Sequence, residues 1–278
     1  MSSCNDVEKI SHILMITAVM IGSIIGNGII CFLLVRFKTL RTVPNILIAN
    51  LAVIDILNAL TNMPLMVMWY ICKVPYLNGQ PVSWFIVTWY VLFMYLTVFN
   101  LTVLTMDRYG AIVHGIHYHS WKTINKAKVA VLFVWLLAAA YTYGMFILGL
   151  DIELGDAPVL VYRKQYLTKF GRHFIIPGYL VPFTIMLVMG VAIWRTVHIH
   201  GRRISTFCSG GGKQVKNDVK TAKTIGLTVV AFFCMGVLPM LLHNIARIHG
   251  SWPHFLAFFL THLNSMANPI IYSLKTPR

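Results

Sequence analysis

One carboxylate, Asp55, lies in the middle of a long apolar stretch of the sequence. Amide and hydroxyl side chains inside other apolar stretches are expected to reach it, namely Asn27, Thr97, Asn264, Ser265 and Asn268. The last three share one helix face, because they fall within five consecutive positions at helical spacing. A carboxylate surrounded by such oxygen ligands predicts a sodium site, formed by Asp55, Thr97, Asn264 and Asn268. A purely structural polar network and a protonated Asp55 are the alternatives.

A second group of charged residues, Asp107-Arg108-Tyr109, stands at the end of the third apolar stretch. An acid beside a base at such a place is commonly a solvated pair of little energetic value. The alternative is a latch, a pair that holds while a helix bundle is closed and breaks when the bundle opens. The charges alone leave both interpretations open.

The composition places these residues in a membrane protein. Of the 278 residues, 58% are hydrophobic and 11% are charged. Soluble domains average about 45–50% apolar and about 25% charged residues. This much apolar surface cannot be buried inside a compact soluble fold. The lipid bilayer is therefore the expected surroundings of the chain.

Seven apolar segments are long enough to cross about 30 Å of hydrocarbon as helices. They are Ile13–Val35, Asn45–Ile71, Trp84–Met106, Val129–Leu150, Phe174–Ile193, Thr224–Ile245 and Phe255–Leu274. Since lipid does not tolerate unpaired backbone groups, the fold class is all-α, a seven-helix membrane bundle. Kinks are predicted at the prolines inside four spans, which are Pro64, Pro182, Pro239 and Pro269.

The distribution of basic residues predicts the orientation. Of the 23 Lys and Arg residues, 16 follow odd-numbered spans, so the amino terminus is expected outside. Residues 1–12 then form an extracellular amino terminus, 13–274 the membrane domain and 275–278 the start of a cytoplasmic tail. The inner segment 199–223, with its run of three glycines, is predicted to be a flexible linker. The basic residues form no single patch, so no nucleic-acid partner is expected.

The motifs resemble those of the rhodopsin-like G-protein-coupled receptors, in the same order and over nearly the whole chain. The residues that carry the resemblance are Gly26-Asn27, Leu51–Asp55, Asp107-Arg108-Tyr109, Trp135, Pro182, Phe233 with Pro239, and Asn268-Pro269-Ile270-Ile271-Tyr272. The resemblance implies a sodium site at Asp55 and contact of Arg108 with a heterotrimeric G protein, and it favours the latch. The implied coupling and activation residues are Asp107, Arg108, Tyr109, Asn268, Pro269 and Tyr272.

The chain departs from the family pattern at several positions. Ser83 replaces the cysteine usual at the start of the third span, so the usual disulfide is absent, and Cys4 with Cys72 is an alternative outer pair. Val237 replaces a tryptophan of the sixth span, and Gly190 a tyrosine of the fifth. The inner helix usual after the seventh span is also missing, which is typical of a truncated chain. These changes leave the strength of signalling open.

The resemblance places a ligand among the third, fifth, sixth and seventh spans. Tyr90 stands where amine receptors carry an Asp and His262 where opsins carry the retinal lysine, so neither a cationic amine nor retinal is expected. The Thr261-His262 pair and Asn244 look like those of adenosine receptors, which suggests a nucleoside; another small molecule, a lipid and a peptide are alternatives. The predicted ligand-binding residues are Tyr90, Met94, Leu241, Asn244, Thr261 and His262.

The expected function is that of a multi-pass plasma-membrane receptor that passes an extracellular signal to a G protein. No pairing of a nucleophile with a base and no metal-ligand spacing indicates an enzyme or a metal site. Two other classes stay open. A decoy receptor would bind without signalling, and a transporter or channel would require a polar path through the bundle.

Overall fold

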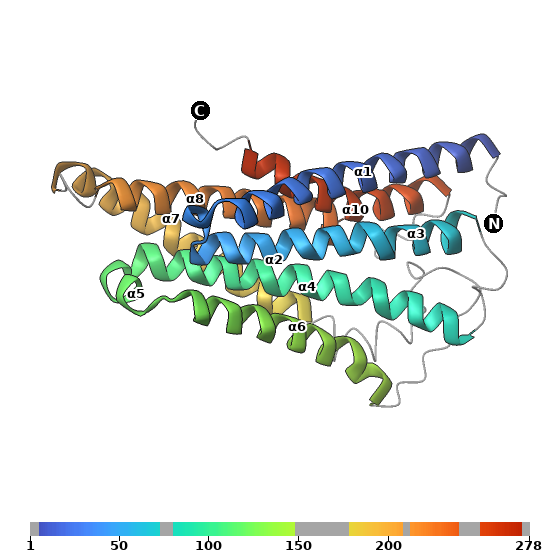
Figure 1. Cartoon of the computed structure of the whole chain (residues 1–278), viewed down its shortest axis with the longest axis horizontal. Coiled ribbons are helices and arrows are strands. Elements are labelled where there is room, and N and C mark those ends of the chain that lie inside the picture. The colour runs from blue at the N-terminus through green and yellow to red at the C-terminus, as the bar shows by residue number, and fades with distance from the viewer. Residues whose placement is uncertain (1–5, 73–79, 148–177, 208–211, 239–250, 274–278) are drawn as a thin grey trace.

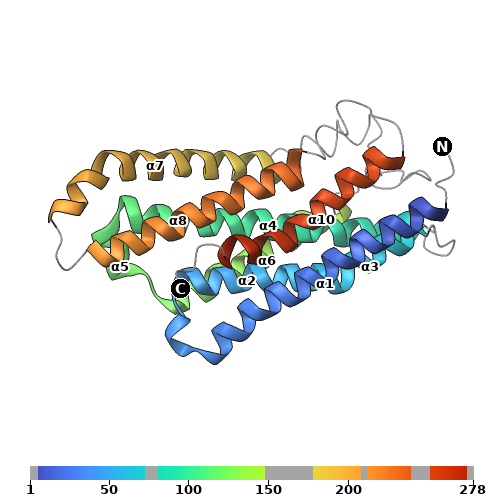
Figure 2. The same cartoon turned by 90° about the horizontal axis from the view of Figure 1, so that it is seen from above.

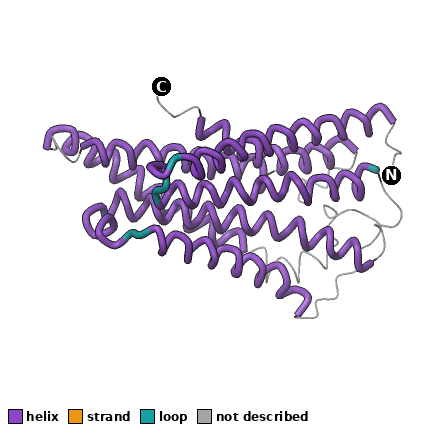
Figure 3. Tube along the Cα trace, in the orientation of Figure 1, coloured by secondary structure: helices purple, strands orange, loops and turns teal. Residues whose placement is uncertain are grey.

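The computed structural model describes residues 6–72, 80–147, 178–207, 212–238 and 251–273 of the chain. Within these ranges nearly every residue is helical, and the helices run roughly along one long axis (Figures 1 and 3). The elements are α1 (Asp6–Arg36), η1 (Lys38–Leu40), α2 (Val43–Leu57), η2 (Asn58–Asn62), α3 (Met63–Met66), η3 (Val67–Ile71), α4 (Gln80–Val113), α5 (Gly115–Trp121), α6 (Ile124–Ile147), α7 (Val181–Phe207), α8 (Gly212–Phe232), η6 (Phe233–Val237) and α10 (Ser251–Ser273).

The helices confirm the all-α fold class and correspond to the predicted spans. Among the described residues, six helical segments are long and apolar enough to cross a membrane, and they match the first six spans. The seventh span corresponds to α10, whose 23 residues are sufficient in length. It is less apolar because polar side chains such as His262, Asn264 and Asn268 occupy its buried face.

Some of the prolines inside spans lie beside π-helical turns. Pro64 lies in α3 between the π-helical turns η2 and η3. Pro182 follows three π-helical residues, 178–180, whereas Pro269 lies inside the α-helix α10. Pro239 lies outside the described residues, although the π turn η6 ends just before it. Such turns widen a helix locally and are frequent at functional sites.

The helix α4 forms the centre of the bundle and positions most of the residues discussed below. It packs against α2, α6, α7 and α8. In the most apolar 18-residue stretch of its Thr88–Val113 segment, 83% of the residues are buried. The corresponding share is 11–39% in the other five membrane-length helices. Large apolar side chains of α1, α6 and α7 are exposed instead, as expected for a surface that faces lipid. Figure 2 shows α1 and α7 on opposite sides of the bundle.

The inner ends of two helices correct the predicted linker. Helix α7 continues to Phe207 and α8 begins at Gly212, so most of the segment 199–223 is helical rather than flexible. Lysine, arginine and glutamine are good helix formers, and beyond the bilayer their polar ends lie in water. The two helices project together at the end of the bundle where α5 lies, opposite the amino terminus (Figure 2).

Candidate functional site

The buried carboxylate of Asp55 lies between α2 and α10. Its side chain is 1% exposed, and Asn268 donates a hydrogen bond from Nδ2 to Asp55 Oδ2 over 2.7 Å. The side chain of Ser265, one helical turn before Asn268, also interacts with the carboxyl group. The structure thus brings Asp55 together with two of its expected partners from the seventh span.

Asn27 is near this group but has a different role from the one expected. Its Nδ2 donates to the backbone oxygens of Ser23 and Ser265, each over 3.0 Å, so it links α1 to α10. The hydroxyl of Ser23 in turn donates to the backbone oxygen of Asp55 over 3.5 Å. Asn27 therefore joins the helices around the carboxylate through their backbone oxygens, and Ser23 is a neighbour that sequence reasoning missed.

The residues around Asp55 fit a small cation that prefers oxygen ligands. Four buried amide oxygens have no hydrogen-bond partner among the described residues, namely Oδ1 of Asn27, Asn62, Asn264 and Asn268. Leaving a buried acceptor unpaired costs about 1–3 kcal/mol. A cation or a water molecule bound between the carboxylate and the amide oxygens would pair with these oxygens and recover that cost.

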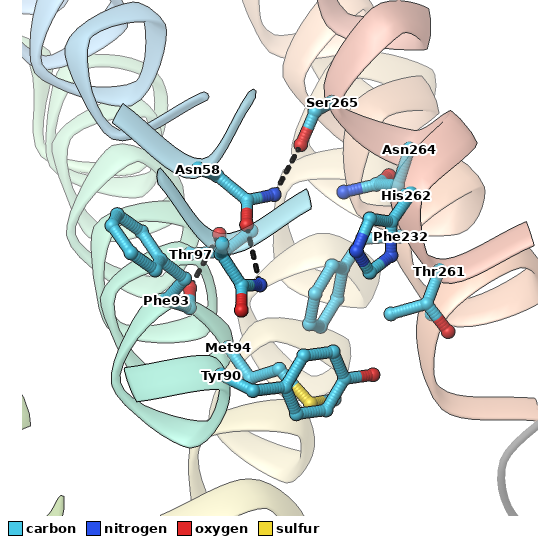
Figure 4. A pocket seen from close by; sticks show the side chains of 12 residues that line it. Asn58, Tyr90, Phe93, Met94, Thr97, Phe232, Thr261, His262, Asn264 and Ser265 are labelled. Carbon is cyan, nitrogen blue, oxygen red and sulfur yellow. Dashed lines mark hydrogen bonds between the residues drawn. The ribbon is translucent and has the colours of Figure 1, made fainter. Parts of the chain in front are cut away.

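Next to this group, and lined in part by Ser265, is a small cavity of about 30 Å³ with both polar and apolar walls. Of the predicted sodium-site residues, Thr97 of α4 and Asn264 of α10 line it, whereas Asp55 and Asn268 do not. The same cavity is lined by Asn58, Asn62 and Ser265 (Figure 4). Its volume has room for about two water molecules. The cavity is thus too small for a ligand of drug size, which needs roughly 300 Å³ or more.

The opposite wall of the cavity contains the predicted ligand-binding residues. Tyr90, Met94, Thr261 and His262 all line it. The rings of Tyr90 and His262 stack with their centroids 6.0 Å apart, so α4 and α10 meet directly here. Leu241 and Asn244, the other two predicted ligand residues, lie outside the described residues.

Two lining residues, Asn58 and Asn62, were not predicted. Asn62 donates from Nδ2 to Asn58 Oδ1 over 2.8 Å, and Asn58 donates from Nδ2 to Ser265 Oγ over 3.1 Å. Figure 4 shows Asn58 directed toward Ser265 across the gap between the second and seventh spans. The rule that selected Asn264 and Asn268, amides four residues apart inside an apolar span, would also have selected this pair.

At the inner end of α4, Asp107 and Arg108 form a buried ion pair. Arg108 Nε donates to Asp107 Oδ2 over 2.7 Å, and its terminal nitrogen contacts the same oxygen. The hydroxyl of Tyr118 on α5 donates to the other oxygen of Asp107. The two charged residues are 6% and 1% exposed, so the interpretation as a solvated surface pair is wrong for this state. Their separation on activation stays a prediction.

The remaining predicted switch residues lie around the same end of the bundle. Tyr109 is half-buried, with its ring against His114 at 5.4 Å between centroids. Tyr272 of α10 interacts with the hydroxyl of Thr228 on α8, which links the sixth and seventh spans. Pro269 lies against α1 at Gly26, where an added Cβ would be 2.7 Å from the proline ring.

A polar clamp that sequence reasoning missed joins α2, α4 and α6. Asn50 donates from Nδ2 to Asn100 Oδ1 over 2.8 Å, and Trp135 donates from Nε1 to Asn50 Oδ1 over 3.0 Å. Asn100 completes the clamp by donating to the backbone oxygen of Leu47 over 3.1 Å. The clamp fixes the position of α4 relative to the helix that carries Asp55.

The departures from the family pattern are only partly described. Cys72 is exposed and forms no disulfide with a described residue, and Cys4 lies outside the described residues, so their pairing stays a prediction. At Gly190 an added Cβ would meet nothing within 4 Å, so α7 has open space where the family usually places a tyrosine ring. Nothing is described of the side chain of Val237.

Comparison with known proteins identifies the family. The family model of the 7 transmembrane receptors (rhodopsin family) matches residues 26–272, and the chain therefore belongs to this family. It is 27% identical to somatostatin receptor type 2 of Mus musculus over 263 residues, covering 89% of this chain and 69% of that receptor. It is 27% identical to trace amine-associated receptor 2 of Rattus norvegicus over 281 residues, with 92% and 78% covered. A rhodopsin of Camponotus atriceps is 26% identical over 287 residues, with 92% and 72% covered.

Membership of this family confirms several expectations. The chain is a G-protein-coupled receptor and not an enzyme, a multi-pass protein of the plasma membrane whose partners are a G protein and an extracellular ligand. The three relatives are not adenosine receptors, so they lend no support to the narrower resemblance to that group.

Proposed function

We propose that this receptor passes the binding of a small, uncharged polar ligand to a heterotrimeric G protein through Arg108. The observation that carries the proposal is the buried pair of Asp107 and Arg108, closed by the hydroxyl of Tyr118. An arginine that is 1% exposed cannot meet a partner protein until helices separate. Ligand binding between the outer halves of the helices would favour the open state, in which Arg108 becomes accessible.

The predicted ligand-binding residues that line the cavity favour an uncharged polar ligand, and the cavity would have to widen to admit it. Tyr90, Thr261 and His262 offer hydroxyl and imidazole groups, and no described residue that lines the cavity carries a carboxylate. One relative is named for trace amines, but Tyr90 occupies the position of the acid that binds the amine in such receptors. Adenosine is the first compound to test, because Nε2 of His262 is buried without a hydrogen-bond partner and suits a ribose hydroxyl.

We further propose that Asp55 binds a sodium ion that stabilises the inactive receptor. The support is the buried carboxyl group of Asp55 together with unpaired amide oxygens of Asn264 and Asn268. When bound, the cation would neutralise the carboxylate. The protein's own part is to hold these oxygens in place, with Asn268 fixed by its hydrogen bond to Asp55 and Thr97 on the facing wall.

The test measures G-protein dissociation in cells that express this chain, with and without adenosine. Arg108→Ala is expected to abolish basal and stimulated responses. Lys38→Ala, which removes an exposed cation at the inner end, is expected to leave both responses unchanged. Surface labelling checks that each variant reaches the membrane.

The outcomes separate the parts of the proposal. Basal activity without an adenosine effect would keep the signalling receptor and refute the nucleoside. A response that survives Arg108→Ala at normal surface expression would refute the role of Arg108. Silence of a surface-expressed chain, together with specific ligand binding, would favour the decoy, in which Gly190 and Val237 replace parts of the activation machinery.

A further inference from the structure

The π-helical turn η2 begins three residues after Asp55 and contains both Asn58 and Asn62. The backbone N–H of Met63 bonds to the oxygen of Asn58, five residues before it, which is the hydrogen-bond pattern of a π turn. In this wider turn, side chains four residues apart lie nearly above one another. The two amides therefore line one wall of the small cavity beside the carboxylate.

The amides form a directed chain of hydrogen bonds that ends at Ser265. Asn62 donates to Asn58 over 2.8 Å, and Asn58 donates to Ser265 Oγ over 3.1 Å. A hydroxyl has one donor and two acceptor lone pairs. Because Asn58 occupies one lone pair (Figure 4), the hydroxyl hydrogen and the other lone pair of Ser265 have a defined direction. The same serine side chain interacts with the carboxyl group of Asp55.

The free end of this chain indicates that the cavity holds a bound polar group. Asn62 is 1% exposed, and its Oδ1 has no hydrogen-bond partner among the described residues. Across the cavity, Oδ1 of Asn264 is also buried and unpaired. Two unpaired carbonyl oxygens around a space for about two waters are suited to hold hydration water of a cation.

We propose that Asn58 is a positioning residue of the sodium site and that Asn62 and Asn264 hold the water of the ion. Asn58 acts through Ser265, whose hydroxyl it orients, and does not itself contact the cation. This inference rests on the proposed sodium site at Asp55. It assigns a function to a π turn whose amides would otherwise be only a structural link between the second and seventh spans.

The experiment measures thermal unfolding of the purified full chain against sodium concentration, with choline replacing sodium at constant ionic strength. A ligand that binds the folded state raises its stability with concentration, so the titration reports the apparent sodium affinity without any agonist. Asn58→Leu is expected to raise the half-maximal sodium concentration about fivefold, the effect of losing one hydrogen bond. Asn62→Ala is expected to raise it about two- to threefold, because Asn58 keeps its bond to Ser265.

Two controls separate positioning from general damage. Leu60→Ala changes an exposed side chain of the same π turn and is expected to leave sodium affinity unchanged. Asp55→Asn removes the carboxylate and is expected to abolish the sodium effect. If Asn58→Leu does not fold, Asn58→Ser replaces it, because serine is too short to reach Ser265 but adds no bulk.

Each result decides one question. Sodium stabilisation that disappears in Asp55→Asn and weakens in Asn58→Leu, but not in Leu60→Ala, supports the inference. Stabilisation that requires Asp55 yet is equal in Asn58→Leu and the original chain overturns the role of Asn58 and keeps the sodium site. An original chain that sodium does not stabilise overturns both. If Asn58→Leu has a lower unfolding midpoint in choline but the same sodium affinity as the original chain, Asn58 is purely structural. That result also overturns the inference.

Discussion

The clamp between α2, α4 and α6 allows a stability prediction with a worked magnitude. Trp135→Phe keeps an aromatic ring but removes the donor to Asn50, which is one hydrogen bond of 3.0 Å. Hydrogen bonds between membrane helices are worth about 0.6 kcal/mol on average and about 1.7 kcal/mol at most. The buried oxygen of Asn50 then lacks a donor, so a loss of about 1 kcal/mol is expected.

Asn100→Ala provides the contrasting variant. It removes two hydrogen bonds at once, the one accepted from Asn50 and the one donated to Leu47, and it leaves a small void. The expected loss is about 2–3 kcal/mol, combining the two bonds with the void. The two variants should therefore differ by about a factor of two or more in their effect.

The assay is the unfolding midpoint of the purified chain, recorded at one heating rate for all variants. A loss of 1 kcal/mol corresponds to about 2–4 °C for chains of this size class. Leu136→Ala, at the next position on α6 and 61% exposed, is the control for changing that helix without touching the clamp. The reasoning is refuted if Trp135→Phe and Asn100→Ala shift the midpoint no more than Leu136→Ala does, or if their order is reversed.

Three further predictions concern other parts of the bundle. Gly26→Leu is expected to cost about 1–3 kcal/mol by overpacking against the proline of α10, whereas Gly28→Ala, where a Cβ meets nothing within 4 Å, should leave the unfolding midpoint nearly unchanged; equal midpoints would contradict this packing. Tyr118→Phe is expected to raise basal nucleotide exchange on a purified G protein about two- to fivefold, because the hydrogen bond it removes from the ion pair is worth about 1 kcal/mol; unchanged exchange would deny Tyr118 a part in the latch. In a Cys4→Ser background, a membrane-impermeant maleimide is expected to label the exposed Cys72 on intact cells; labelling that requires permeabilised cells would reverse the predicted orientation.

The sequence predicts the fold of this receptor well because lipid imposes a simple requirement. A helix that crosses a bilayer needs about 20 apolar residues, and such stretches can be recognised without knowledge of their neighbours. The prediction fails outside the bilayer, where hydropathy carries no information about helix ends. The segment after Ile199 is an example, since its lysines and arginines continue the helix into water.

The site was predicted less completely because contacts across helices depend on rotation about each helix axis. Asn268 bonds to Asp55 as expected, and Asn264 is buried on the same helix as Asn268. Asn58 and Asn62 escaped notice although they too are amides inside an apolar span. Their direction depends on a π turn, which changes the helical phase after Leu57 and which no regular periodicity predicts.

The burial of α4 has a consequence for how the receptor is assembled during its synthesis. A helix at the centre of the folded bundle is first inserted into the lipid by itself and packs against its neighbouring helices only afterwards. The hydroxyls of Thr97, Thr102 and Thr105 donate to carbonyl oxygens one turn earlier on the same helix, so they need no other helix at that stage. Asn100 differs, because its amide is satisfied by α2. The insertion step therefore tolerates the threonines of α4, whereas Asn100 favours early association with the helix that precedes it in the chain.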